Sequence, residues 1–263
     1  MWRPAVALAC VLLLGACAGD DDTPPAMTDA KALADAVRTG TIAGRSAKFG
    51  TDVNAGAVKS KGQGQARFAE DGTALAMTTD VLGDPLELRL TQGKLFAKVP
   101  EGSRGDESGK PWIAVSPDGT DQFSQVLGGS LGQLAGQNDP LRTVGQLRAA
   151  GAITTAERVE LDGTSVEHYW LKLDLEKLGG QLPAGLSAEA VAQLRGKAGA
   201  FGMELWVDDA NRPRQIVLDL SPILTAAGAP DGASARITTR YTDWGSAVDV
   251  EPPPVEQVAT TPG

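Results

Sequence analysis

Few residues in this chain could carry covalent chemistry. The segment Gly128-Gly129-Ser130-Leu131-Gly132 matches G-x-S-x-G, the pattern of a hydrolase nucleophile elbow. His168 is the single histidine, and Asp139 and Asp162 lie between Ser130 and His168, in the chain order of this enzyme class. An elbow also needs a parallel strand before the serine, so the elements around Ser130 decide whether such a triad can exist.

Composition excludes several other classes of protein. The 263 residues carry a formal net charge of −9, whereas a nucleic-acid binder presents a basic face. Two cysteines and one histidine are too few for a tetrahedral Cys/His zinc site or a disulfide framework. We therefore expect no metal, no cofactor and no nucleic-acid partner.

The N-terminus has the layout of an export signal. Arg3 precedes a short apolar run, which is below the roughly 20 residues that a membrane-spanning helix needs. The run ends in Leu14-Gly15-Ala16-Cys17, which resembles the bacterial lipobox, a motif whose cysteine receives a lipid. Residues 1–16 are thus predicted to be a signal peptide and Cys17 a lipid anchor. A plain signal peptide cut near Ala16 or Ala18 is the alternative.

Both flanks of the central region have polar or proline-rich sequence. Residues 17–27 are acidic and contain Pro24 and Pro25, which predicts a disordered tether behind the acylated Cys17. Residues 251–263 begin with Glu251 and three prolines, which predicts a stiff tail beyond the fold. One domain is expected over residues 28–250.

Within that domain, strict alternation of apolar and polar residues recurs, as in half-buried antiparallel strands. Strands are predicted around residues 47–53, 75–81, 86–90, 94–99, 112, 169–175, 203–207, 216–220 and 237–241. Helical signals fall on residues 28–38, within 120–150 with a second helix opening at Asp139-Pro140, and on 187–198. The prediction is an α+β fold, a single large curved antiparallel sheet with helices covering its concave apolar face.

This pattern argues against the esterase reading of Ser130. The elbow needs an α/β fold, and the alternation places His168 opposite the apolar stripe, away from the helix that carries Ser130. His168 is expected to be a surface strand residue, and Trp170, Trp206 and Trp244 are expected on the same outer face. The chain is accordingly predicted not to be an enzyme.

The order of several segments resembles a known family. After the lipobox come Gly93–Pro100, the Trp112 strand, Asp139-Pro140-Leu141, Asp162–Tyr169, Leu205–Asp208 and Tyr241–Gly245 before a proline-rich end. Together they resemble the LppX/LprA/LprF/LprG family of actinobacterial, mycobacterial-type lipoproteins. The resemblance implies a half-barrel like that of the LolA/LolB carriers, with an apolar cavity for acylated lipids. It supplies no single lipid-contact residue to carry over.

The apolar stripes predict which residues would line such a cavity. On the sheet they are Phe49, Leu75, Met77, Leu88, Leu95, Tyr169 and Leu171, and on the covering helix they are Val126, Leu127 and Leu131. Residue pattern alone leaves open whether the layer is a closed core or a pocket, and the resemblance favours a pocket.

The expected cargo is a lipid or glycolipid with at least two acyl chains, transferred or presented by a monomer anchored at the extracytoplasmic face of the cell membrane. A membrane transporter is a further candidate partner. Two alternatives stay open at this point. One is a sensor or scaffold lipoprotein without cargo, and the other is a serine esterase using Ser130.

Overall fold

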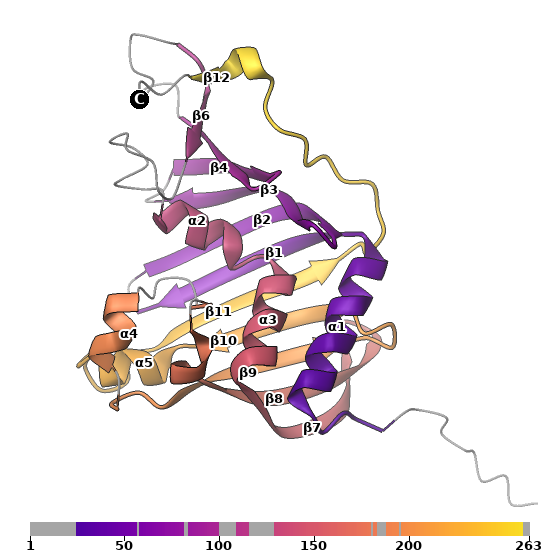
Figure 1. The fold of residues 1–263 in the computed structure, drawn as a ribbon, viewed down its shortest axis with the longest axis vertical. Coiled ribbons are helices and arrows are strands. Elements are labelled where there is room, and N and C mark those ends of the chain that lie inside the picture. The colour runs from indigo at the N-terminus through magenta and orange to yellow at the C-terminus, as the bar shows by residue number, and fades with distance from the viewer. Residues whose placement is uncertain are drawn as a thin grey trace, which may run out of the picture.

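Two successive runs of strands form one open, twisted sheet (Figure 1). In this computed structural model, residues 25–259 are described, apart from 57, 82–83, 100–108, 116–128, 180, 183–187 and 195. The first run consists of β1 (Ser46–Ala55), β2 (Val58–Ala69), β3 (Gly72–Val81), β4 (Asp84–Thr91), β5 (Lys94–Lys98) and β6 (Trp112–Val115). The second run consists of β7 (Gly151–Leu161), β8 (Thr164–Asp174), β9 (Ala200–Val207), β10 (Pro213–Asp219) and β11 (Ala235–Thr242).

The two runs meet where β1 pairs with β11. The strand order is β12-β6-β5-β4-β3-β2-β1-β11-β10-β9-β8-β7, and every neighbouring pair is antiparallel except β12 with β6. The short strand β12 (Val258–Ala259) comes from the C-terminus. This single, mostly antiparallel sheet with helices confirms the predicted α+β fold class.

The helices lie on one face of the sheet, which we call the inner face; the opposite face is the outer face (Figure 1). The helical segments are α1 (Ala30–Gly44), α2 (Gly129–Gly136), α3 (Pro140–Ala150), a 3-10 turn (Leu175–Leu178), α4 (Ala188–Leu194) and α5 (Ser221–Ala226). Asp29 caps α1 and Asp139 caps α3, each accepting a backbone N–H bond. Both capping signals were readable in the sequence.

Strand alternation separates the two faces as predicted. In β1, Ala47, Phe49 and Thr51 are buried on the inner face, whereas Lys48 and Gly50 are exposed on the outer face. The β4–β5 and β7–β8 hairpins turn at Gln92-Gly93 and Asp162-Gly163, with positive φ at both central residues of each turn. Two-residue hairpin turns of this geometry match the strand twist, and they fix the register of each hairpin.

Several elements escaped the sequence pattern. Strand β2 has Ser60, Gly62 and Gly64 at inner positions, so it shows no apolar alternation. In β7 a register shift between Ile153 and Thr155 interrupts the period. The six-residue helix α5 is too short for a helical period to be read from the sequence.

The boundaries of the folded part differ from the predicted residues 28–250. At the N-terminal end, Ala26 and Met27 pack against the core, and the Met27 N–H donates to the Tyr169 hydroxyl at 3.1 Å. The expected tether of residues 17–27 therefore ends before Ala26. Cys17 and the rest of residues 1–24 lie outside the described residues.

The C-terminal tail belongs to the fold, because residues 246–259, here called the C-terminal strap, run along the sheet to β12 (Figure 1). Arg89 donates to the Glu251 carbonyl at 2.6 Å and Gln65 to the Asp249 carbonyl at 2.7 Å. Val250 is fully buried. The sequence predicted a stiff tail beyond the fold from residue 251; these contacts instead hold residues 251–259 along the sheet, since a proline-rich sequence can lie extended across a surface as readily as in solvent.

Candidate functional site

The side chains predicted for the inner layer lie together in one hydrophobic cluster. All of those in the described part are buried, none exposing more than 7% of its surface: Phe49, Leu75, Met77, Leu88, Leu95, Leu131, Tyr169 and Leu171. Val126 and Leu127 lie outside the described residues. The inner face is thus largely apolar, while its role as a ligand site stays a prediction.

The register of the strands explains how this layer fills. Phe49 pairs with Gly64, which pairs with Met77, which pairs with Leu88. A Cβ atom on Gly64 would lie 2.6 Å from Cζ of Phe49, so the Phe49 ring occupies the space that the glycine leaves. Small residues in the inner stripe do not by themselves make a hollow, because large neighbours cover them here.

A polar cluster interrupts the apolar layer near its centre, at the turn between α2 and α3. We call it the Asn138 cluster. The Thr51 hydroxyl donates to Oδ1 of Asn138, the Tyr241 hydroxyl donates to the Asn138 carbonyl at 3.2 Å, and Nδ2 of Asn138 reaches Sδ of Met77 at 3.5 Å. Thr239 lies 3.3 Å from the Thr51 hydroxyl. These bonds hold the α2–α3 turn against β1, β3 and β11.

Asp139 extends this cluster. One carboxylate oxygen accepts from the Thr73 hydroxyl at 2.8 Å and from the Leu141 N–H at 3.0 Å, so the same group caps α3 and binds β3. Burial raises the pKa of the Asp139 carboxyl, which these hydrogen bonds only partly offset. Burial also raises the pKa of Tyr241 well above its ordinary value. In both cases burial shifts the equilibrium toward the neutral form.

The Asp139 cap was predictable from the Asp-Pro sequence, whereas the role of Asn138 was not. Its partners Thr51 and Tyr241 lie 87 and 103 residues away in the chain, and no local pattern connects them. An amide next to a capping aspartate before a proline could have been noted as a turn signal, but its contacts depend on the tertiary fold.

The esterase arrangement does not form. Ser130 belongs to α2, whose Leu131 and Ala135 join the inner cluster. His168 lies on the outer face, where its Nε2 is 3.1 Å from a Glu204 carboxylate oxygen. The sheet therefore lies between the helix that carries Ser130 and the face that carries His168.

His168 is nevertheless not the exposed surface residue that the sequence suggested. Its ring stacks on Trp206 at 3.8 Å between centroids and contacts Trp170 at 3.5 Å. Burial lowers the pKa of His168, and the nearby Glu204 carboxylate opposes that shift. Trp170 and Trp206 lie on the outer face as predicted, but Trp244 packs against Phe68 and the inner core.

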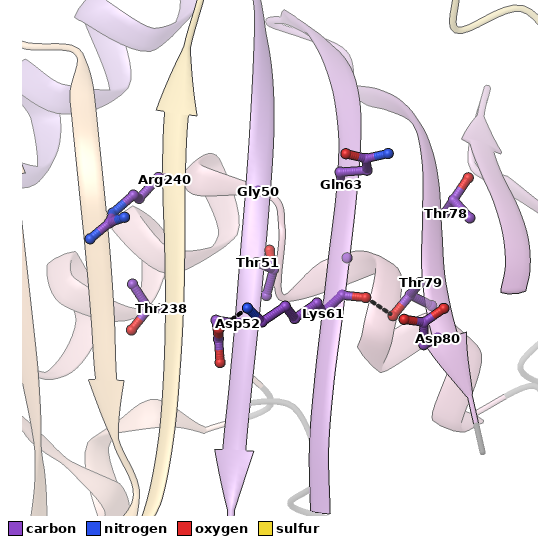
Figure 2. A pocket seen from close by; sticks show the side chains of 11 residues that line it. Gly50, Thr51, Asp52, Lys61, Gln63, Thr78, Thr79, Asp80, Thr238 and Arg240 are labelled. Atoms are coloured by element: carbon purple, nitrogen blue, oxygen red, sulfur yellow. Dashed lines mark hydrogen bonds and ion pairs between the residues drawn. The ribbon is translucent and has the colours of Figure 1, made fainter. Parts of the chain in front are cut away.

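Two open pockets are lined by described residues, and both lie on the outer face. The first, of about 600 Å³, is lined by residues of β11, β1, β2 and β3, among them Arg240, Gly50, Lys61 and Thr78 (Figure 2). The second, of about 560 Å³, continues it toward Arg89 and Asp249. Over the same described ranges, no three His, Cys, Asp or Glu residues are grouped to hold a metal ion. Nor does any helix there have the length and apolar character of a membrane span.

Comparison with known proteins adds a likeness of fold. No protein-family profile and no curated protein sequence matches the chain. The structure is similar to LprF from Mycobacterium bovis, at 14% identity and a TM-score of 0.48, covering 85% of this chain and 96% of that one. It is also similar to the lipoprotein LppX from Mycobacterium tuberculosis, at 14% identity and a TM-score of 0.48, covering 84% and 98%.

A third similar structure is MucB in complex with MucA, at 13% identity and a TM-score of 0.39, covering 88% of this chain and 62% of that one. The chain is thus structurally similar to two members of the lipoprotein family that its sequence resembles. At this identity and these TM-scores the likeness assigns no ligand, so function has to be inferred from this chain's own side chains.

Proposed function

We propose that this protein is a membrane-anchored envelope lipoprotein that holds an acylated lipid between the inner face of its sheet and the helices above it. The apolar part of the inner layer, on β3 and β4 beside the Asn138 cluster, is the observation that carries the proposal. From Leu75 to Thr79 in β3 and from Leu86 to Leu90 in β4, the inner positions carry no ionisable side chain. Acyl chains need such a surface, because burying an unpaired charge against them would be costly.

The element best suited to admit a lipid is α2. It carries Gly129, Gly132 and Gly136 within eight residues, and glycine weakens a helix by about 1 kcal/mol relative to alanine. The Asn138 cluster holds the end of α2 to the sheet. We infer that α2 moves about this fixed end, so that acyl chains enter beneath α2 while a polar headgroup stays at the mouth.

Membrane attachment is assigned to Cys17. A single acyl chain anchors a protein only weakly, whereas lipobox processing would supply two or three. The net charge of −9 disfavours attraction to anionic lipids, so the anchor has to provide the attachment. Replacing Cys17 by alanine should release the protein or leave it uncleaved. Mature Cys17→Ala protein that stays in the membrane would exclude this assignment.

Native mass spectrometry of protein purified from its host tests the lipid cargo. Leu88→Trp and Leu171→Trp enlarge inner-face residues, and each should lower the number of bound lipids per protein. Lys172→Trp is the matched control, since Lys172 is the exposed outer-face neighbour of Leu171. The control should keep wild-type loading.

Thermal unfolding of the same variants separates two explanations. A ligand site should accept the added tryptophan volume with little loss of stability when no lipid is present. Overfilling a closed core should instead cost about 1–3 kcal/mol. Equal lipid loading in all variants, or no lipid in any of them, would mean that the layer is a core and would favour a sensor or scaffold without cargo.

A further inference from the structure

We propose that the outer face carries a second, separate binding site, a groove for a neutral oligosaccharide. The outer groove is formed by the two connected pockets that share Gly50, Gln63 and Thr78. It lies on the face opposite the proposed lipid layer, so it would take a different ligand and does not depend on lipid binding. Its volume of about 600 Å³ in the first pocket lies within the range of small-ligand sites.

Gly50 lines both pockets, and nothing in the fold requires a glycine at this position. Its φ is not in the left-handed region, and a Cβ atom there would meet no atom within 4 Å. Gly64 differs, since a Cβ there would lie 2.4 Å from the Ala76 carbonyl oxygen. Glycine inside a strand weakens it and often marks close approach of a ligand. Gly50 therefore fits a binding role better than a structural one.

The groove runs across the strands in a straight row. Residues Gly50, Gln63 and Thr78 pair with one another across β1, β2 and β3. On the other side the row continues through Arg240 and Gln215 to Trp206 on β9. Gln215 and Trp206 line neither pocket; the two pockets together reach from Arg240 on β11 to Arg89 on β4, which is roughly 19 Å at about 4.8 Å between strands. An extended, chain-like ligand matches this shape better than a compact metabolite.

The lining favours a ligand rich in hydroxyl groups. Gln63, Thr78 and Thr238 offer amide and hydroxyl groups, and Figure 2 shows Lys61 reaching across to Asp52, 3.6 Å away. Each pocket is lined by equal numbers of positively and negatively charged side chains. In the first pocket these are Lys61 and Arg240, and Asp52 and Asp80. In the second, Lys48 and Arg89 face Glu87 and Asp249. Balanced charge offers no net attraction to a polyanion or a polycation.

Beyond the pockets, the row passes the buried Gln215 and ends at an aromatic surface. Trp206 is partly exposed, and its ring stacks on the buried His168 ring with 13° between their planes. Gln215, the next residue in the row, accepts from Nε of Arg240 at 2.7 Å, which holds that guanidinium over the sheet. A fixed aromatic ring beside amide, hydroxyl and guanidinium groups suits a sugar, whose ring has apolar C–H faces and polar edges.

A peptide is a poorer match. Peptides are bound by adding a strand to a sheet edge, by filling an apolar groove or by an arginine cluster. On the face between β11 and β3 the backbone groups are already used by the neighbouring strands, and the lining is polar. The outer groove has the features of none of these modes.

Isothermal titration calorimetry of the purified protein tests the site with neutral hexasaccharides of glucose, mannose, galactose and arabinose, and with polyphosphate and an unrelated decapeptide. We expect at least one hexasaccharide to bind and polyphosphate and the peptide not to bind. Gly50→Tyr fills the groove and should weaken that binding by about tenfold or more. Gly202→Tyr is the matched control, because Gly202 is an outer-face glycine of β9 where a Cβ would make only an ordinary 3.6 Å contact.

Gln63→Ala gives a second test that changes the lining without adding bulk, and it should weaken hexasaccharide binding several-fold. Lipid loading of Gly50→Tyr and Gln63→Ala should stay at the wild-type level, which separates this site from the inner layer. The proposal is overturned if no hexasaccharide binds, if only polyphosphate or the peptide binds, or if Gly50→Tyr and Gly202→Tyr bind the sugar equally well.

Discussion

The two faces of the sheet are covered by different kinds of structure. Helices α1, α2 and α3 lie on the inner face, which is apolar except at the Asn138 cluster. On the outer face, the C-terminal strap crosses one part, the rings of Trp170 and Trp206 cover His168, and the groove around Gly50 is left open. An alternating strand can therefore serve two purposes at once, because successive side chains enter different environments.

The largest expected effect comes from moving a charge to the inner face. Leu88→Asp should lower the free energy of unfolding by more than about 4 kcal/mol, because it buries an unpaired carboxylate in place of a fully buried leucine. Ala76→Asp, on the outer face next to Arg89, should cost no more than about 1 kcal/mol. Urea denaturation measures both. Equal losses in the two variants would contradict the assignment of faces.

Removing the C-terminal strap should have the next largest effect. Truncation after Val250 removes the Glu251 carbonyl that accepts from Arg89, and the pairing of β12 with β6. At about 1 kcal/mol for each hydrogen bond, we expect a loss of about 3 kcal/mol. Differential scanning calorimetry would show this as a lower Tm. An unchanged Tm would mean that the fold ends at residue 250, as the sequence first suggested.

The Asn138 cluster should have an intermediate effect. Asn138→Ala removes the acceptor of the Thr51 hydroxyl and leaves this buried group only its 3.3 Å contact with Thr239, which should cost about 2 kcal/mol. Thr78→Ala, on the outer face of the neighbouring strand β3, is the control and should change stability by under about 0.5 kcal/mol. Chemical denaturation compares them. A smaller loss in Asn138→Ala than in the control would mean that the Asn138 cluster does not stabilise the fold.

The smallest expected effect is a dependence on pH. Because burial raises the pKa of Asp139 above its ordinary value of 3.8, the folded protein holds this proton more tightly than the unfolded chain does. The free energy of unfolding should therefore fall as the pH rises from about 4 through the folded pKa. Asp139→Asn keeps a capping side chain and should remove this fall, changing stability by roughly a few tenths of a kcal/mol. A wild-type pH profile parallel to that of Asp139→Asn would contradict the shift.

Sequence predicted the inner face more fully than the outer one. In β4, Leu88 lies between Glu87 and Arg89, and this alternation can be recognised from the local sequence alone. The structure confirms that Leu88 faces inward and its two neighbours outward. The burial of His168 depends on Trp206, which becomes its neighbour only through the register of β8 with β9. Pairing across strands is set by the whole sheet, so no pattern within a single strand reveals it.

The groove and the C-terminal strap were missed for a related reason. In the sequence, Gly50 is one position of the polar face. A missing side chain can be recognised as part of a hollow only when the neighbouring residues on β2 and β11 are known. The strap contacts Arg67 and Arg89, which lie far away in the chain. Its prolines predict an extended segment, but they do not predict the surface on which that segment lies.

Labelling with a photoreactive acyl lipid would show on which face of the sheet an acyl chain binds. Purified protein is loaded with a phospholipid that carries a diazirine in its acyl chain, irradiated, and digested, and the labelled residues are identified by tandem mass spectrometry. We predict labels at every second residue of β3 and β4, on Leu75, Met77, Leu86 and Leu88, and on α2. Labels on the intervening outer residues Ala76, Thr78 and Glu87, or labels spread over both sets, would contradict a lipid site on the inner face.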